Sequence, residues 1–524
     1  MGAFLGAGIV LFAVSAAAAD SAPIANLTIG QIRGTQLEQG GAVFKGIPYA
    51  QPPIFNLRWR PPQPVRSWQG MVRDATGFGS PCSQMSGGRM MVNSQEDCLF
   101  LNVWTPDWPA KTRLPVMVWF HGGGNYAGTA SSDNFDGESL ARHGVVLVTV
   151  NYRLNVFGFL AHPGLTQESP HHSSGNYGLL DQIAALQWVH DYIARLGGDP
   201  ANVTIFGQSA GAVDVNVLMT TPLAKGLFHR VIAESGTVTR NPDPISMSMT
   251  ALGNLMPVKN GPVTYSDAPT LAEAEQAGEK FGGSLKDLRE APAGDLLKAT
   301  TAPRMSIGPA NGVVVDGWVF PKPPAEVFAT GHELRVPLLI GNNARERTPP
   351  QATPEDLQKA MEAMYGPLAP RAFALYAVEG PDPLYGGPGA QWVVDSLYRC
   401  PVVAQVVWHS AAGNRSYEYQ YDHAPPGREA LGAVHGAEVP YVFGKLGENA
   451  VAVDRDISAA MEQYWTNFAK TGNPNGAGLP QWPAFDAKAR GYLEFTDNGP
   501  VTREGLRRPY CDLYVDNVKR LVGR

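Results

Sequence analysis

The 524-residue sequence predicts an α/β fold with a central, mostly parallel sheet flanked by helices. Strand-like apolar runs alternate with helical patterns, as in sheets covered on both faces. A Phe-His-Gly-Gly-Gly stretch at 120–124 ends one such run, at 114–120. A Gly-Gln-Ser-Ala-Gly stretch at 207–211 follows another run and leads into an apolar helical pattern. Strand, sharp turn and helix are the setting of a nucleophile elbow.

Composition is that of an ordinary globular protein, with 44% hydrophobic and 17% charged residues. The net charge is −6 and no long run has one sign, which argues against a nucleic-acid partner. Residues 1–19 read as an export signal, with an apolar stretch at 4–14 and small residues at 15–19, although no positive charge precedes it. We expect a secreted or periplasmic protein without a membrane anchor, whose residues 20–524 form one domain.

The four cysteines suit an oxidising compartment. Cys82 and Cys98 enclose a short polar loop, and a bridge there would stabilise the fold by roughly 3 kcal/mol. Cys400 and Cys511 are far apart, and the sequence leaves their pairing open; buried free thiols are the alternative for all four. No Cys-x-x-Cys or histidine cluster indicates a metal, and no cofactor is expected.

The elements expected along the chain follow from local patterns. Alternation punctuated by glycines predicts a small antiparallel sheet at 24–44, and the Pro-rich run 47–64 predicts extended surface chain. The irregular region 240–330 predicts an insertion over the sheet, with a helix near 271–281. The other expected strands are 114–120, 144–151, 203–206, 231–233, 336–341, 416–421 and short ones from 493, and the other helices are 179–193, 211–218, 354–365, 391–412 and 458–471.

A serine nucleophile needs an imidazole base, a carboxylate and oxyanion donors. Ser209 would stand at the apex of the turn, where Gly207 and Gly211 relieve backbone crowding. Each oxyanion donor is worth roughly 3 kcal/mol. The expected donors are the amides of Gly123, Gly124 and Ala210.

The base should follow the serine in the chain, with the acid between them. Chain order disfavours His332, and helical or strand contexts disfavour His229 and His409. The residues alone do not choose between His423 and His435. Glu346, just past an expected strand, is the candidate acid; a surface glutamate paired with Arg345 or Arg347 is the alternative.

Two segments, Glu-Asp-Cys-Leu-Phe-Leu-Asn-Val-Trp-Thr-Pro at 96–106 and Phe-Gly-Gln-Ser-Ala-Gly-Ala at 206–212, resemble the signatures of the type-B carboxylesterase family. That family belongs to the α/β-hydrolase superfamily and includes cholinesterases, bacterial para-nitrobenzyl esterases and fungal lipases. The resemblance runs from about Gly34 to Cys511. It implies an α/β-hydrolase fold with a small N-terminal sheet and helical insertions over the active site. It also implies a serine carboxylesterase that works through an acyl-enzyme.

The resemblance carries over residue by residue. Its His-Gly-x-Glu context selects His435 as the base, and its acid position selects Glu346. It further implies a first disulfide between Cys82 and Cys98. It also implies a buried ion pair of Arg58 with Glu96, and a serine near the acid, Ser235.

Three positions depart from the family pattern. Gln208 stands where glutamate is usual, and Asp214 stands where a small serine is common. Glu346 is flanked by arginines rather than followed by glycine, and these could hold it ionised or turn it away from His435.

The substrate is expected to be a small ester. Residues 83–97 contain no aromatic side chain to hold a quaternary ammonium group, so a choline ester is rejected. The Pro- and Met-rich region 240–330 favours an apolar pocket for uncharged short or medium acyl chains. The alternatives are a polar or polycarboxylate ester, a lipase-like substrate, or a non-catalytic binding or adhesion protein. A monomer or weak homo-oligomer is expected.

Overall fold

The computed structural model describes residues 22–239, 268–301, 313–346, 353–376, 381–424 and 426–521. The expected export signal at 1–19 lies outside these ranges. So do residues 240–267 and 302–312 of the expected insertion. Within the described ranges, no helix is both long and apolar enough to cross a membrane.

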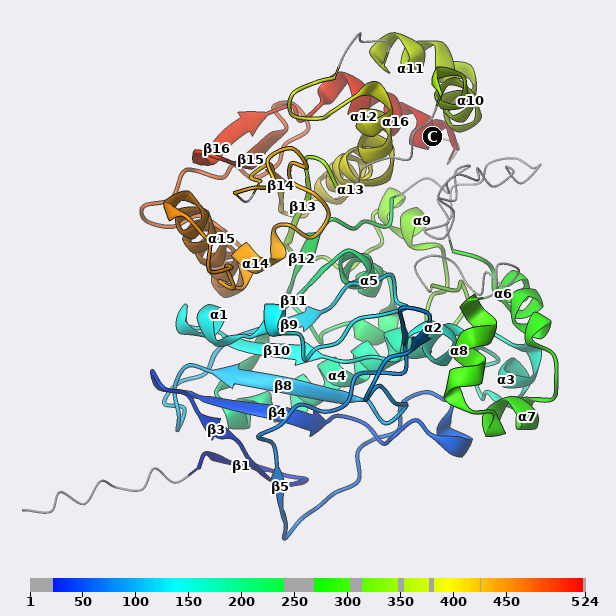
Figure 1. Cartoon of the computed structure of the whole chain (residues 1–524), viewed down its shortest axis with the longest axis vertical. Helices are drawn as coiled ribbons and strands as arrows, with labels where there is room; N and C mark the ends of the chain where they lie inside the picture. Colours follow the sequence, from blue (N-terminus) through cyan, green and yellow to red (C-terminus); the bar gives the residue numbers. More distant parts are fainter. Residues whose placement is uncertain are drawn as a thin grey trace, which may run out of the picture.

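One eleven-stranded sheet runs through the molecule (Figure 1), in the order β16-β15-β14-β13-β12-β11-β9-β10-β8-β4-β3. Every pairing from β15 to β10 is parallel, and the pairings beyond them at the two edges are antiparallel. The mostly parallel sheet is therefore confirmed. Its strands are β3 (Thr35–Gln36), β4 (Ala42–Pro48), β8 (Phe100–Thr105), β9 (Leu114–Phe120), β10 (Val146–Val150), β11 (Gly198–Gln208), β12 (Arg230–Glu234), β13 (Leu338–Asn343), β14 (Ser416–Tyr421), β15 (Gly491–Thr496) and β16 (Gly499–Glu504).

Helices cover both faces of this sheet. Strand β9 shows why, because Val116, Val118 and Phe120 enter one apolar core and Met117 and Trp119 enter the other. The first core is completed by α4 and α5, and the second by α14 and α15. The helices are α1 (Glu138–Arg142), α2 (Asn155–Phe159), α3 (Pro163–Glu168), α4 (Tyr177–Tyr192), α5 (Ala210–Leu218), α6 (Leu271–Gly278), α7 (Leu285–Glu290), α8 (Ala293–Thr301), α9 (Pro324–Ala329), α10 (Pro354–Tyr365), α11 (Ala369–Tyr376), α12 (Pro388–Val394), α13 (Cys400–Ala411), α14 (Val439–Val442), α15 (Ala452–Thr471) and α16 (Arg508–Leu521).

The N-terminal region is more divided than the sequence predicts. A small sheet is present, but it joins β1 (Ile24–Leu27), β2 (Gly30–Arg33) and β5 (Val72–Asp74), with β2 and β5 parallel. The rest of the expected sheet, β3 and β4, pairs instead with the edge of the large sheet. The prediction that 47–64 lies on the surface is wrong at 47–50 and at Arg58 and Trp59, which are buried. Trp59, 1% exposed, packs in an apolar core with Val156 and Phe157, and its indole donates to the Val156 carbonyl.

Later elements differ in extent. The helix expected at 391–412 consists of α12, the wider turns of η7 (Asp395–Arg399) and α13. The helix expected from 458 begins at Ala452, where the Val451 amide donates to the Asp454 carboxylate. Strand β8, the hairpin of β6 (Met85–Ser86) and β7 (Arg89–Met90), and the terminal helix α16 were not predicted. Within the described part of the insertion, α6, α7 and α8 lie together at one end of the molecule (Figure 1).

Candidate active site

Ser209 occupies the sharp turn between β11 and α5. Its backbone has φ 58° and ψ −121°, a conformation that is unfavourable for a residue with a side chain. The turn is held by the Ser209 amide, which donates to the Glu234 carbonyl at 2.8 Å. A Cβ on Gly207 would lie 2.6 Å from the Phe120 carbonyl oxygen, and one on Gly211 only 2.0 Å from it. Glycine is therefore required on both sides of the serine.

The structure brings Ser209, His435 and Glu346 together from three separate parts of the chain. His435 Nε2 lies 2.8 Å from Ser209 Oγ, and its Nδ1 lies 2.6 Å from Glu346 Oε2. The acid is anchored by the Asn343 amide, which donates to Glu346 Oε1 at 2.7 Å, and the His435 amide donates to the Glu346 carbonyl. Glu346 is buried, whereas the His435 side chain is 19% exposed.

The other downstream histidines have different partners. His423 lies between Asp454 and Asp497, with both nitrogens at 2.7 Å from a carboxylate oxygen. His409 is buried against Glu333, His229 accepts from the Val203 amide, and His332 is exposed. Of these histidines, only His435 is within hydrogen-bonding distance of Ser209.

The arginine beside Glu346 does not contact its carboxylate. The Arg345 guanidinium donates instead to the carbonyls of Leu384, Pro383 and Ala430. It therefore binds the neighbouring loops rather than turning the acid away from His435. Arg347 lies outside the described residues.

The expected oxyanion donors are Ala210, which follows Ser209, and Gly123 and Gly124, which follow Gly122; a Cβ on Gly122 would lie 3.0 Å from Ser209 Cβ. Gly123 and Gly124 have φ values of 110° and 64°, and a Cβ on Gly123 would lie 1.9 Å from the Ala127 carbonyl oxygen. Within the described part of the chain, no hydrogen bond uses the amides of Gly123, Gly124 or Ala210. These three donors are thus left for a ligand, the last of them at the first position of α5.

Two further buried carboxyls lie close to the acid and were not singled out from the sequence. The Asn343 side-chain amide donates to Glu438 at 2.5 Å. Burial and the charge of Glu346 raise the pKa of Glu438 to about 7. Burial and Glu438 raise the pKa of Glu234 well above its ordinary range. Both groups therefore favour the neutral form beside Glu346. Their sequence signals are that Glu438 is the glutamate of the His-Gly-x-Glu motif and that Glu234 precedes Ser235.

Ser235, which the resemblance places near the acid, is buried in a left-handed conformation with φ 57°. Its amide donates to the Gly341 carbonyl at 2.9 Å, which ties β12 to the strand that precedes Glu346. Its hydroxyl makes no hydrogen bond with a described residue. The backbone of Ser235, rather than its hydroxyl, therefore connects it to the acid's strand.

The two departures in the elbow touch the catalytic groups or their support. Gln208 Nε2 lies 3.3 Å from His435 Nε2, and its side chain lies against Gly122 and Gly436. Asp214 is fully buried on α5 and accepts from Gln182 and from Asn125, the residue after Gly124.

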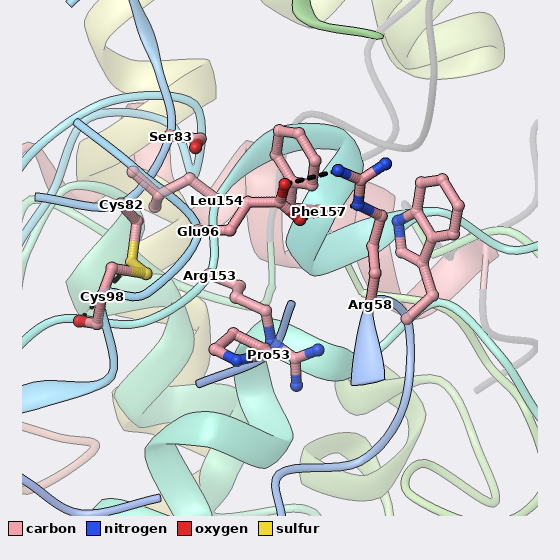
Figure 2. A pocket seen from close by; sticks show the side chains of 10 residues that line it. Pro53, Arg58, Cys82, Ser83, Glu96, Cys98, Arg153, Leu154 and Phe157 are labelled. Atoms are coloured by element: carbon pink, nitrogen blue, oxygen red, sulfur yellow. Dashed lines mark hydrogen bonds and ion pairs between the residues drawn. A yellow bond between two sulfur atoms is a disulfide. The ribbon is translucent and has the colours of Figure 1, made fainter. Parts of the chain in front are cut away.

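The expected ion pair and disulfide line one small cavity (Figure 2). Arg58 binds both carboxylate oxygens of Glu96, at 2.7 and 2.5 Å, and also donates to the Leu288 and Ala291 carbonyls. The Cys82–Cys98 disulfide lies beside them. The cavity is about 10 Å³, room for about one water molecule, and through Arg58 the ion pair joins the loop at 83–97 to α7 and the residue after it.

Cys400 and Cys511, whose pairing the sequence left open, are joined in a second disulfide that ties α13 to α16. The residues expected to form an apolar acyl pocket fall partly on 240–267 and 302–312, outside the described ranges. Among the residues described, no group of three or more His, Cys, Asp or Glu side chains could hold a metal ion.

Comparisons with known proteins point to one family. The model of the carboxylesterase family matches residues 21–366 and 389–514. Carboxylesterase 1D of Rattus norvegicus is 36% identical over 90% of this chain and 89% of its own. Fumonisin B1 esterase of Sphingopyxis macrogoltabida is 32% identical over 92% of this chain and 88% of its own. A carboxylesterase structure from Geobacillus stearothermophilus has a TM-score of 0.78 at 32% identity, covering 94% of this chain and 100% of that one.

Proposed function

Because this chain belongs to the carboxylesterase family, we propose that it hydrolyses carboxylic esters through an acyl-enzyme formed on Ser209. The family relationship makes the chain a carboxylic ester hydrolase that acts on a small-molecule ester. The assignment of the residues rests on one observation, the continuous hydrogen-bonded series Ser209–His435–Glu346.

In the first step, Ser209 Oγ forms a bond to the ester carbonyl carbon while its proton moves to His435 Nε2. Glu346 accepts the hydrogen bond from Nδ1 and stabilises the imidazolium. The carbonyl oxygen becomes an oxyanion. It is held by the amides of Gly123, Gly124 and Ala210, each worth roughly 3 kcal/mol in the transition state.

The tetrahedral intermediate then collapses, breaking the bond to the alcohol oxygen. The alcohol leaves with the proton from His435 Nε2, and the acyl group stays on Ser209. Water attacks this acyl-enzyme by the same route, giving its proton to His435. The acid is released and Ser209 recovers its proton. No step uses a cofactor.

Uncharged esters with short or medium acyl chains are the proposed substrates. The Pro- and Met-rich composition of 240–330 supports an apolar lining, and the described part of that region packs Leu288, Leu296 and Leu297 into an apolar core with Phe157 and Phe159 of α2. A polar ester is the second candidate, since one relative is named for fumonisin B1. Arg345, the described arginine next to the acid, is already bonded to backbone carbonyls and does not favour this candidate.

We also propose that residues 1–19 direct export, that residues 20–524 form one catalytic domain, and that the protein is a monomer or weak homo-oligomer. The two disulfides support an oxidising compartment. Mass spectrometry of the mature N-terminus and size-exclusion chromatography with light scattering test these points.

Hydrolysis of p-nitrophenyl esters from acetate to palmitate tests the function. We expect activity on the shorter esters, its loss in Ser209→Ala, and a fall in kcat of about 10²–10⁴ in Glu346→Gln, which upsets the histidine tautomer. The exposed His332→Gln is the matched control and should keep full activity. Full activity in Glu346→Gln would place the acid elsewhere, and full activity in Ser209→Ala would end the proposal.

A further inference from the structure

The oxyanion loop, residues 121–125, has an unusual backbone conformation that neighbouring residues must stabilise. Gly123, Gly124 and Asn125 are consecutive residues with φ of 110°, 64° and 58°. Such a run belongs to no helix or strand, so its shape depends on the contacts of its side chains and neighbours. Asparagine is one of the few residues with a side chain that tolerates this region.

Asn125 is the residue of this run whose side chain reaches the protein interior. It is 2% exposed, and its carbonyl accepts from the Asn155 amide at 2.7 Å. Its side-chain oxygen lies 3.0 Å from the Tyr152 hydroxyl, which also donates to the His121 carbonyl at 2.6 Å. Its side-chain nitrogen donates to Asp214 Oδ1 at 3.1 Å.

Asp214 stands on the helix that begins with Ala210, the third expected oxyanion donor. Its second oxygen accepts from Gln182 of α4 at 2.6 Å. No lysine or arginine among the described residues pairs with it. The carboxylate is therefore held by two side-chain amides alone, one of which belongs to the oxyanion loop.

We propose that Asp214 is a positioning residue for catalysis. It fixes the oxyanion loop through Asn125, so that the Gly123 and Gly124 amides point at the same oxyanion as the Ala210 amide. This inference rests on the proposed acyl-enzyme mechanism. The link joins both halves of the hole, because Asp214 and Ala210 share one rigid helix and Asn125 directly follows Gly124. A small serine at 214, common in the family, is too short to make this contact.

An exchange of the two side chains tests the link. Asn125→Asp alone replaces the amide that donates to Asp214 with a second carboxylate. Because such a pair shares a proton at neutral pH, all variants are assayed at alkaline pH, where both groups are charged and should push the loop away. Adding Asp214→Asn restores the fit, because the amide introduced at position 214 donates to the carboxylate introduced at position 125 and still accepts from Gln182. The side chain at position 125 keeps an oxygen that faces the Tyr152 hydroxyl. Asp214→Ser removes the contact without adding a charge.

Measuring kcat, KM, inhibitor affinity and melting temperature separates a positioning role from an effect on folding. One oxyanion donor is worth about 10²–10³ in kcat, so a displaced loop in Asn125→Asp should lower kcat by at least about tenfold with little change in KM. The affinity for a trifluoromethyl ketone, whose serine adduct carries an oxyanion, should fall in parallel. Asp214→Ser should show the same pattern more weakly, and Asn125→Asp/Asp214→Asn should recover most of the loss. Val217→Ala, a buried change elsewhere on α5, should lower the melting temperature and leave kcat unchanged.

Two results would overturn the proposal. One is kcat within about twofold of wild type in both Asn125→Asp and Asp214→Ser. The other is a loss in Asn125→Asp that the added Asp214→Asn does not repair. Failure of the underlying mechanism would look different, because wild type would then be inactive or Ser209→Ala would remain active.

Discussion

Replacing Asp214 by asparagine removes this buried carboxyl from the proton balance. The introduced NH2 faces an amide donor of Asn125 or Gln182, which costs a hydrogen bond at every pH, so the pH dependence of the stability difference measures the cost of burying the charge. Burial raises the pKa of Asp214 from 3.8 to about 7, against the smaller effect of hydrogen bonds from Asn125 and Gln182. The other titratable group that faces it is Tyr152, whose own pKa is raised well above its ordinary range, so it stays neutral. At ~1.4 kcal/mol per tenfold change in proton affinity, the rise in the pKa of Asp214 corresponds to about 4 kcal/mol of free energy for ionising the buried carboxyl.

The sign follows from proton binding. The folded chain holds the Asp214 proton more tightly than the unfolded chain does. As pH rises from about 4 to about 7, the unfolded chain loses this proton first, and wild type loses stability. Asp214→Asn has no such proton. Between pH 4 and pH values above 7, the stability of the variant relative to wild type should therefore rise by up to about 4 kcal/mol, on top of a pH-independent loss from the missing hydrogen bond.

Urea unfolding followed by tryptophan fluorescence at pH 5, 6, 7 and 8 gives the comparison. Between pH 5 and 8, the stability of Asp214→Asn relative to wild type should rise by about 2–3 kcal/mol. Asp74→Asn, at a carboxyl that is 59% exposed, is the control and should show no such trend. A difference between Asp214→Asn and wild type that is the same at pH 5 and pH 8 would refute the reasoning.

Two further predictions concern the second disulfide and the elbow. The double variant Cys400→Ser/Cys511→Ser opens a disulfide that spans 111 residues, so its free energy of unfolding in urea should fall by about 4–5 kcal/mol. A loss of kcat in the folded variant would contradict a purely structural role for this disulfide. Gln208→Glu places a carboxylate where an amide now lies 3.3 Å from His435 Nε2. The carboxylate would stabilise the protonated imidazole, so the acid limb of the pH profile of kcat/KM should move to higher pH. An unmoved limb would mean that the new carboxylate turns away from His435.

The features that could be predicted from the sequence are those encoded locally. Strand β9 was predicted to the residue, and the elbow around Ser209 was predicted with its glycines, because each pattern lies within a few consecutive residues. The Gly123–Gly124 pair after β9 is likewise a short pattern of consecutive residues. Local patterning also gave the parallel sheet, since alternation of strands and helices is itself a local signal.

The features that could not be predicted depend on contacts between distant segments. Residues alone did not separate His435 from His423, because the difference lies in which carboxylates meet each ring. The burial of Trp59 depends on a carbonyl in α2, and the pairing of Cys400 with Cys511 depends on the unpredicted α16. No periodic pattern reports such contacts.

Two of the three departures from the family pattern, at 208 and 214, meet at one place in the structure. Gln208 and Asp214 lie on opposite sides of Ser209 in sequence, and both reach the segment 121–125. Gln208 lies against Gly122 and beside His435, and Asp214 binds Asn125. The serine, the base and the acid set which reaction occurs, whereas the position of this segment sets how well the oxyanion is bound. Differences in rate between this enzyme and relatives that carry glutamate and serine at 208 and 214 should therefore appear in kcat and in oxyanion-analogue affinity, rather than in KM.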